Sequence, residues 1–345
     1  MNPSAVPRVV VTGATGNVGT SLVRLLSSEP RVGSVLGLAR RRPGLELPGV
    51  EWAEVDISLE RDEPRLARYL ADADAVVHLA WRFGPTHDPV ATWRTNVLGA
   101  VRVFDAVAAA RVPVLVHASS VGAYSPGPEG GAPVSEAWPT HGWPGAAYTR
   151  EKAYLERVLD TFERDHPLIR VVRMRPAFLF KEESASGQRR IFAGRFFPGS
   201  LIRPDLLPML PEFEGLRFQV LHTEDAADAY RRVLLRDVRG PFNLAAEPVI
   251  DGATLGELLN ARPVRVPAGA VRGALSAAWR LRLASASPGL FDALRHMPLL
   301  ATERARRELE WEPSRSSLDA LEEFLRGVRT GAGDDTGPLV GHRIG

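Results

Sequence analysis

The sequence predicts an α/β protein with a doubly wound parallel sheet, and two observations support that prediction. Apolar, β-branched runs of strand length alternate with segments of helical periodicity from Val9 to Arg175, the order expected of parallel strands joined by crossover helices. The first strand and helix are joined by a turn with glycines at a spacing of three, Gly13, Gly16 and Gly19. We therefore expect a Rossmann-type sheet with a smaller C-terminal lobe.

Each expected element has its own sequence signal. Strands are predicted where β-branched and apolar residues run together, and helices where apolar residues recur at three and four positions. The expected strands are 9–11, 32–40, 51–57, 74–80, 112–118, 169–175, 218–222 and 242–244. One helix is expected directly after the glycine turn. Further helices are expected at 62–71, 89–111, 146–164 and 223–235, and over much of the remaining chain up to 326.

The same pattern suggests a division into two units. Residues 1–180, with return segments at about 216–250, are expected to form a dinucleotide-binding domain, because they contain the alternating strands and helices. Residues 181–215 and 251–328 are assigned to a substrate-binding lobe. The Gly-rich, polar residues 329–345 are expected to be a disordered tail.

Composition excludes several classes of site. The chain has 345 residues, a net charge of +2 and no cysteine, so it has no thiol nucleophile, disulfide or Cys-ligated zinc. Its histidines are scattered, and no metal site is expected. Interspersed charges argue against nucleic acid as a partner. No apolar stretch approaches the roughly 20 residues of a membrane span, so we expect a cytoplasmic protein that acts on a small molecule.

The glycine turn predicts a site for the diphosphate of a dinucleotide. Glycines at these positions permit a tight turn, close approach of the diphosphate, and close packing of helix against strand. The following helix N-terminus offers free N–H groups and the positive end of its dipole. The residues expected to bind the cofactor here are Gly13, Thr15, Gly16, Asn17, Val18 and Gly19.

The second strand ends in arginines where an NAD-binding protein would be expected to carry an acid. Arg40 and Arg41 could pair with the 2′-phosphate of NADP, since a guanidinium matches phosphate geometry. We therefore expect NADP as cofactor, with NAD possible. The alternative interpretation is a solvated basic turn.

Tyr148 and Lys152 are four positions apart on a predicted helix, and so share one face. An ammonium near the phenol would lower its pKa from about 10, so that Tyr148 could act as an acid or base. Ser120 follows a predicted strand and could donate to a substrate carbonyl. Lys152 and Lys181 are the only lysines in a chain otherwise rich in arginine, which indicates that arginine cannot replace them.

These motifs resemble the extended short-chain dehydrogenase/reductases, also called the NAD-dependent epimerase/dehydratase family. The resemblance covers roughly residues 8 to 328. The matching pieces include Thr12-Gly13, Asp56-Ile57, His78-Leu79-Ala80, Asn96-Val97, Ser119-Ser120, Tyr148 with Lys152, Arg175-Pro176 and His222-Thr223.

The resemblance implies a role for each matching residue. Tyr148 would be the general acid/base, Lys152 would bind the nicotinamide ribose and lower the Tyr148 pKa, and Ser120 would position the substrate carbonyl. Asp56 and Ile57 would meet the adenine, and Leu79 and Ala80 would line the cofactor. Asn96 would be a structural or water-holding partner of the catalytic group. The family also implies a homodimer, paired through the helices at 89–111 and 146–164.

Three functions fit these motifs. The leading one is an NADP(H)-dependent oxidoreductase acting on a carbonyl or secondary alcohol. The alternative is an epimerase of a sugar or nucleotide sugar that retains NAD, and a third is a non-catalytic cofactor sensor. A 4,6-dehydratase is set aside. The dehydratases of the family that this chain resembles carry an Asp-Glu pair just after the serine or threonine, whereas Val121-Gly122 follows Ser120 here.

Overall fold

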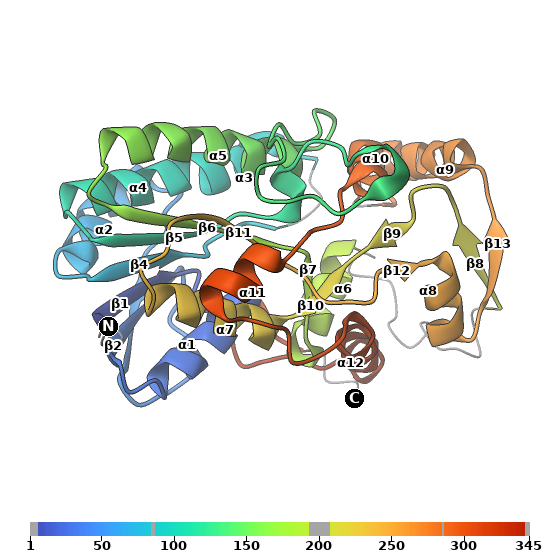
Figure 1. Ribbon diagram of the computed structural model, residues 1–345. Coiled ribbons are helices and arrows are strands. Elements are labelled where there is room, and N and C mark those ends of the chain that lie inside the picture. The colour runs from blue at the N-terminus through green and yellow to red at the C-terminus, as the bar shows by residue number, and fades with distance from the viewer. Residues whose placement is uncertain (1–5, 84–86, 193–207, 285, 342–345) are drawn as a thin grey trace.

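A seven-stranded, all-parallel sheet forms the centre of the computed structural model, which describes residues 6–83, 87–192, 208–284 and 286–341 (Figure 1). The strand order is β11-β6-β5-β4-β1-β2-β3, so the order reverses between β1 and β4. Ligands of such sheets bind at the carboxyl ends of the strands beside this reversal. The strands are β1 (Val6–Thr12), β2 (Val32–Ala39), β3 (Val50–Glu54), β4 (Ala75–His78), β5 (Val114–Ala118), β6 (Arg170–Pro176) and β11 (Gly240–Leu244).

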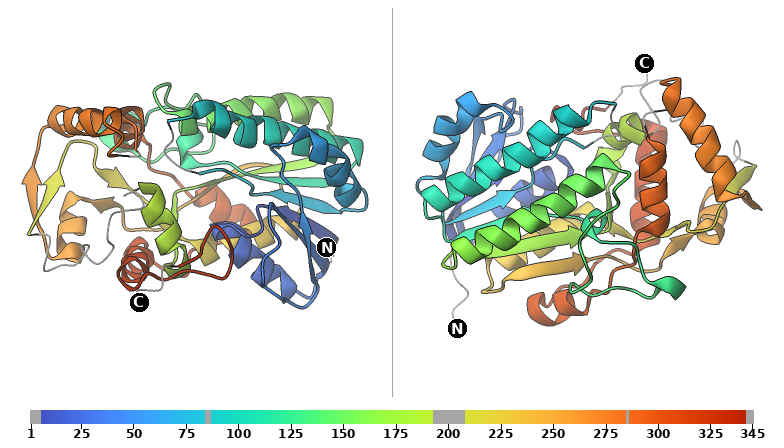
Figure 2. Two further views of the ribbon diagram at one scale, coloured as in Figure 1. Left: turned by 180° about the vertical axis from the view of Figure 1, so that it is seen from behind. Right: turned by 90° about the horizontal axis from the view of Figure 1, so that it is seen from above.

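Helices cover both faces of the sheet (Figure 1). One face carries α2 (Glu63–Leu70), α3 (Pro89–Trp93), α4 (Gly99–Ala109) and α5 (Ala147–Asp165), and Figure 2 shows α4 and α5 running side by side. The other face carries α1 (Asn17–Ser27), α7 (Thr223–Leu234) and α11 (Glu303–Leu309). Each layer buries its own apolar core against the β-branched strands. The predicted α/β class with a doubly wound parallel sheet is therefore confirmed.

Two predicted elements are interrupted. The long helix expected at 89–111 contains a π-helical turn, Arg94–Leu98, between α3 and α4. The strand expected at 218–222 divides into β9 (Arg217–Phe218) and β10 (Val220–His222) at Gln219. The buried Gln219 amide donates to Glu247 at 2.8 Å and accepts from the Leu300 N–H at 2.7 Å. These side-chain bonds connect the two short strands to more distant parts of the chain.

The smaller lobe lies at one end of the sheet, at the right of Figure 1. It contains β8 (Met209–Glu212), β12 (Ile250–Asp251), α8 (Gly252–Leu259), β13 (Arg262–Arg265), α9 (Ala268–Arg280) and α10 (Pro288–His296).

Parts of the segments assigned to this lobe pack elsewhere. After β7 (Phe178–Phe180), Lys181 bonds to Thr20 of α1, and Trp311 lies in the core beneath α7. α6 (Ala185–Phe192) packs against α12 (Ser317–Thr330). We therefore propose that the lobe contains fewer residues than the segments 181–215 and 251–328 first assigned to it. Residues 193–207 of that assignment lie outside the described part of the chain.

The expectation of a disordered tail at 329–345 is wrong for the part that the structure describes. α12 ends at Thr330, and residues 331–341 then fold back onto the protein with Thr336 and Leu339 buried. A segment rich in glycine and acidic residues can still be ordered when folded partners satisfy its polar groups.

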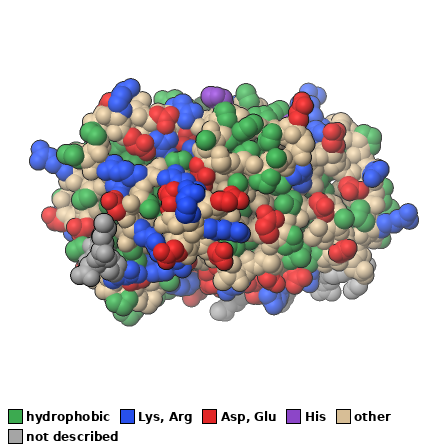
Figure 3. All heavy atoms as spheres, viewed as in Figure 1, with side chains coloured by type: hydrophobic (Ala, Val, Ile, Leu, Met, Phe, Trp, Pro, Cys, Tyr) green, Lys and Arg blue, Asp and Glu red, His purple; other side chains and the backbone are tan. Residues whose placement is uncertain are grey.

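No helix in the described ranges is long and apolar enough to cross a membrane. Nor do those ranges contain a group of three or more His, Asp or Glu side chains suited to a metal ion. On the face seen in Figure 3, acidic and basic side chains are interspersed.

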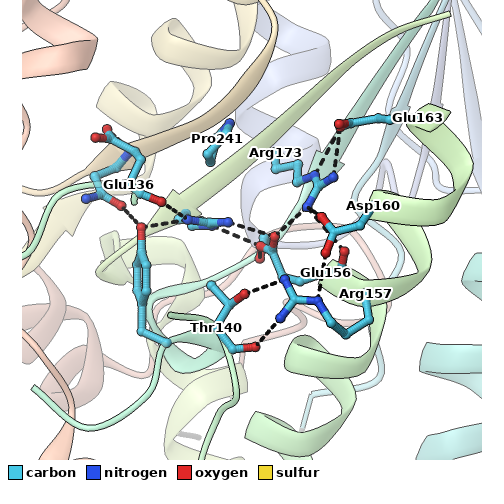
Figure 4. Close-up of polar contacts among 12 residues, drawn as sticks. Glu136, Thr140, Glu156, Arg157, Asp160, Glu163, Arg173 and Pro241 are labelled. Atoms are coloured by element: carbon cyan, nitrogen blue, oxygen red, sulfur yellow. Dashed lines mark hydrogen bonds and ion pairs between the residues drawn. The ribbon is translucent and has the colours of Figure 1, made fainter. Parts of the chain in front are cut away.

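A buried charge cluster fixes α5 against the sheet (Figure 4). The Glu156 carboxylate on α5 accepts from Arg175 at 2.7 and 2.9 Å and from Arg173 at 3.0 Å, both on β6. Ser119, at the end of β5, donates to the same carboxylate at 2.5 Å. Although burial alone would raise it, the two guanidinium groups lower the pKa of Glu156 to about 2.

We predict that Glu156→Gln destabilises the protein by about 3 kcal/mol at pH 7, because the buried Arg175 guanidinium loses its counter-ion and Arg173 loses one of its carboxylate partners. The folded-state pKa of Glu156 lies below the usual value of 4.5. The ionised carboxylate therefore contributes its full stabilisation of the folded state above pH 4.5, and this stabilisation is lost as pH falls towards 2. Urea unfolding across this pH range measures both effects.

Glu163→Gln is the matched control, since Glu163 contacts the same Arg173 at 3.0 Å but its side chain is 36% exposed. It should cost less than about 1 kcal/mol. Equal stability of Glu156→Gln and the unmodified protein would contradict the importance of the cluster.

Candidate active site

The glycine turn forms an open cradle at the start of α1. Gly13 has φ +70°, and a Cβ there would lie 2.6 Å from the Ala80 backbone, so only glycine fits. Gly16 is the N-cap of α1 and has no side-chain capping bond, and the first helical bond runs from the Thr20 N–H to Gly16 at 3.0 Å. The N–H groups of Asn17 and Val18 precede that bond, so the turn fits a diphosphate.

Asn17 anchors the turn through its side chain. Its amide donates to the Leu179 carbonyl and accepts from Thr223, both at 3.2 Å. These bonds fix the side chain, and the backbone N–H of Asn17 faces no intrahelical partner at the start of α1. Thr15 is buried at the same turn.

The arginines predicted to meet a 2′-phosphate follow β2 directly. Arg40, Arg41 and Arg42 are all exposed, and the Arg42 N–H donates to Glu54 at 3.1 Å. β2 ends at Ala39, so the structure places these cations at the carboxyl edge of the sheet, next to β1.

The residues expected along the cofactor lie at the same edge. Leu79 and Ala80 follow β4, and the Leu79 N–H donates to Thr12 of β1 at 3.0 Å, which places both beside the glycine turn. Asp56 and Ile57 lie just beyond β3, which ends at Glu54. The Asp56 carboxylate accepts from the Ser58 hydroxyl at 2.6 Å, so it already stabilises its own turn.

Ser120 and Tyr148 meet near the end of β5. The Tyr148 hydroxyl donates to Ser120 Oγ at 2.8 Å, and the Gly122 N–H donates to the same oxygen at 3.0 Å. Both acceptor positions of the serine are therefore used, and its own O–H is the group that can donate to a ligand. A Cβ at Gly122 would lie 2.7 Å from the Tyr148 ring, so glycine allows this close approach.

Lys152 does not point at the Tyr148 hydroxyl in this structure. Its ammonium donates to the Ala118 carbonyl at 2.6 Å and lies 3.5 Å from the centroid of the Trp81 ring. Burial lowers the pKa of Lys152 to about 7, against the opposing charges of Glu156 and Glu151.

The expected lowering of the Tyr148 pKa is absent here. Burial raises the pKa of Tyr148 to about 12, the nearby Glu151 charge adds to the rise, and the hydrogen bond with Ser120 only partly opposes it. The structure brings together the three residues of the expected constellation, but the tyrosine is held in its neutral form.

Asn96 lies in the π-helical turn and is fully occupied by protein partners. Its amide oxygen accepts from the Arg82 N–H at 2.7 Å, and its amide nitrogen donates to Glu151 at 2.7 Å and to the Arg82 carbonyl at 3.2 Å. Thr92 donates to the same Glu151 carboxylate at 2.6 Å. This geometry favours a structural role, in which Asn96 holds the chain that follows β4.

That chain contains two aromatic side chains that lie against the proposed catalytic residues. Trp81 covers the Lys152 ammonium, and the rings of Trp81 and Phe83 are nearly perpendicular to the Tyr148 ring, with centroids 5.8 and 5.1 Å away. Sequence reasoning missed Glu151, although an acid between the tyrosine and the lysine was an available signal.

Comparison with known proteins gives the family. A profile of the NAD dependent epimerase/dehydratase family matches residues 9–245. An uncharacterized protein of Mycobacterium tuberculosis, Rv0501, is 24% identical over 335 residues, covering 93% of this chain and 84% of its own. L-arabinose 1-dehydrogenase (NAD(P)(+)) of Haloferax volcanii is 34% identical over 113 residues. This match covers 33% of this chain and 41% of the length of the dehydrogenase.

Among solved structures, UDP-glucose 4-epimerase of Thermotoga maritima with UDP-glucose superposes with a TM-score of 0.71. It is 18% identical, and the match covers 94% of this chain and 99% of that one. This likeness shows the fold alone. Together with the family profile and the parallel sheet, it leads to one conclusion: the chain belongs to the NAD-dependent epimerase/dehydratase family.

Proposed function

We propose that this protein is an NADP(H)-dependent oxidoreductase that transfers hydride at a carbonyl or secondary alcohol. The observation that supports it most directly is the 2.8 Å bond between Tyr148 and Ser120 at the carboxyl edge of the sheet. A phenol and a hydroxyl that meet beside a dinucleotide cradle can together polarise one substrate oxygen.

The chain's own residues would handle the oxygen and its proton. The Ser120 hydroxyl donates to the carbonyl oxygen and holds its carbon in place. Tyr148 gives its proton to that oxygen during reduction, and takes a proton from the alcohol during oxidation. The nicotinamide, when bound, supplies or accepts the hydride. Lys152 would bind the ribose through an N–H that is not used by the Ala118 carbonyl, since an ammonium has three donors.

The turn and the arginines support a phosphorylated dinucleotide. The N–H groups of Asn17 and Val18 would hold the diphosphate, and Arg40 and Arg41 the 2′-phosphate. Asp56, Ile57, Leu79 and Ala80 would enclose the adenosine end, because they lie at the same edge of the sheet. The family description supports NAD as the alternative cofactor.

An epimerase of a sugar or nucleotide sugar is the second candidate, favoured by the family and by the fold shared with UDP-glucose 4-epimerase. The same Tyr148 and Ser120 would serve it, with the cofactor retained between turnovers. A dehydratase remains disfavoured, because the Tyr148 ring occupies the space that a side chain at position 122 would need.

We further propose a homodimer formed through the helix pair α3–α4 and α5. Val90, Leu98 and Tyr154 on these segments are 57, 42 and 46% exposed, which is unusual for apolar groups on adjacent helices. Covering them with a second copy would bury this surface.

The first test is to denature the purified protein and identify any nucleotide it releases. We expect no stoichiometric NAD, and NADPH binding at least tenfold tighter than NADH binding, since a guanidinium–phosphate pair contributes on the order of 1–2 kcal/mol. Arg40→Ala should remove most of this preference, measured by calorimetry. Arg42→Ala is the control and should leave it unchanged. Tightly held NAD, with no effect of Arg40→Ala, would instead support the epimerase.

Tyr148→Phe should lower turnover of the first substrate found by roughly a hundred- to ten-thousandfold, because the proton donor is lost. Cofactor affinity should change little, which fluorescence titration with NADPH can check. Tyr69→Phe on α2, outside the proposed site and the proposed dimer helices, is the control and should retain activity. An unaffected Tyr148→Phe variant would point to a cofactor sensor rather than an enzyme.

For the dimer, we expect light scattering to give twice the 37.6 kDa chain mass. Leu98→Arg should give monomers, because a charge would be buried in the interface. Leu168→Arg, at a leucine that is 91% exposed and lies outside the helix pair, should remain dimeric. A monomeric unmodified protein would refute the proposal.

A further inference from the structure

The chain after α12 forms a compact structure that the family profile does not cover. Residues 331–341 are called the C-terminal segment here. Within it the Asp334 N–H donates to the Leu339 carbonyl at 2.8 Å, and the Leu339 N–H donates to Thr336 at 2.9 Å. Thr336 is fully buried and Leu339 is 4% exposed. The family profile ends at residue 245 and so does not describe this segment.

The segment binds the turn and helix proposed to hold the cofactor diphosphate. The Thr336 hydroxyl donates to the Thr15 carbonyl at 3.0 Å, between residues 321 positions apart in sequence. The Asp334 carboxylate pairs with Arg24 of α1 at 2.9 and 3.1 Å, and only 9% of the Asp334 side chain is exposed. Both contacts therefore join the C-terminal segment to the glycine turn and its helix.

The segment also passes close to one of the proposed phosphate-binding arginines. A methyl group added at Gly337 would lie 3.4 Å from Nη2 of Arg41, an ordinary van der Waals distance, so about the width of a methyl group separates the segment's backbone from that guanidinium. An exposed arginine loses conformational entropy when it binds a phosphate. A neighbouring surface that limits the positions open to Arg41 would reduce that loss.

These contacts leave the phosphate-binding groups free. Thr336 uses a carbonyl of the turn, whereas a phosphate would use N–H groups of Asn17 and Val18. Asp334 neutralises Arg24, which lies further along α1 than the turn. Lys181, which follows β7, donates to Thr20 and Ser21 of α1 at 2.8 and 3.0 Å. The turn is therefore held by side chains that do not compete with a phosphate.

We propose that the C-terminal segment is a cofactor-binding element, which orders the glycine turn and Arg41 for the phosphorylated adenosine end of the dinucleotide. The inference rests on the proposed function, because it requires a dinucleotide at this cradle. Preorganisation of this kind raises affinity mainly by slowing dissociation.

The test compares matched variants of the full chain. Asp334→Asn removes the partner of Arg24, and Asp335→Asn changes the exposed neighbouring acid in the same way. Thr336→Val removes the hydroxyl with little change in shape, and Thr336→Ser keeps it. Dissociation constants for NADPH and for adenosine 2′,5′-bisphosphate are measured by calorimetry, and NADPH release by stopped-flow fluorescence.

We expect Asp334→Asn and Thr336→Val each to weaken both ligands by roughly five- to tenfold, as for loss of one buried polar contact, and to speed NADPH release. Asp335→Asn and Thr336→Ser should bind like the unmodified protein. A chain ending at Thr330 should lose more affinity than either point variant. Circular dichroism and thermal melting verify that each variant is folded.

Two results would overturn the inference. Folded variants that bind and release NADPH like the full chain would show that the segment is only a structural cover. Tighter binding after truncation would make it a competitor of the cofactor. If the unmodified protein binds neither NADPH nor NADH, the proposed function itself fails, and this inference with it. If the unmodified protein binds NADPH and the folded variants bind it equally well, only this inference fails.

Discussion

The contact between Glu156 and the arginines of β6 sets the position of everything that follows in the site. Tyr148, Lys152 and Glu156 are four residues apart on α5 and therefore share one helical face. Glu156 is fixed by Arg173 and Arg175 on β6 and by Ser119 at the end of β5. Since Ser119 precedes Ser120, one carboxylate sets both the register of α5 and the strand end that Tyr148 must reach.

Sequence reasoning predicted the parts that depend on local pattern. The β-branched runs of β1, β4 and β5 and the glycine spacing define elements on their own, and parallel strands bring their carboxyl ends to one edge. That rule alone predicted that Ser120 and the glycine turn lie at a shared edge. That Tyr148 and Ser120 act on one substrate oxygen was an implication of the family resemblance, and no sequence pattern predicted the contact between their side chains.

The rest depends on contacts between residues far apart in the chain. Gln219 interrupts a strand because its amide is bonded to Glu247 and Leu300, and no neighbouring residue signals this. The C-terminal segment has the composition of a disordered tail, yet Arg24 and Thr15 order it from more than 300 positions away. The direction of the Lys152 ammonium is likewise set by two partners, the Ala118 carbonyl and the Trp81 ring, and periodicity encodes neither contact.

Burial also explains why the protein by itself does not activate its tyrosine. One cause, removal from water, raises the pKa of Tyr148 to about 12 and lowers the pKa of Lys152 to about 7. Both shifts favour the neutral forms, whereas proton transfer by a phenolate beside an ammonium needs the charged forms. The Lys152 ammonium donates to the Ala118 carbonyl. The base role that we propose for Tyr148 would therefore need further polar partners for both groups, and partners supplied by a bound ligand would confine the chemistry to the loaded site.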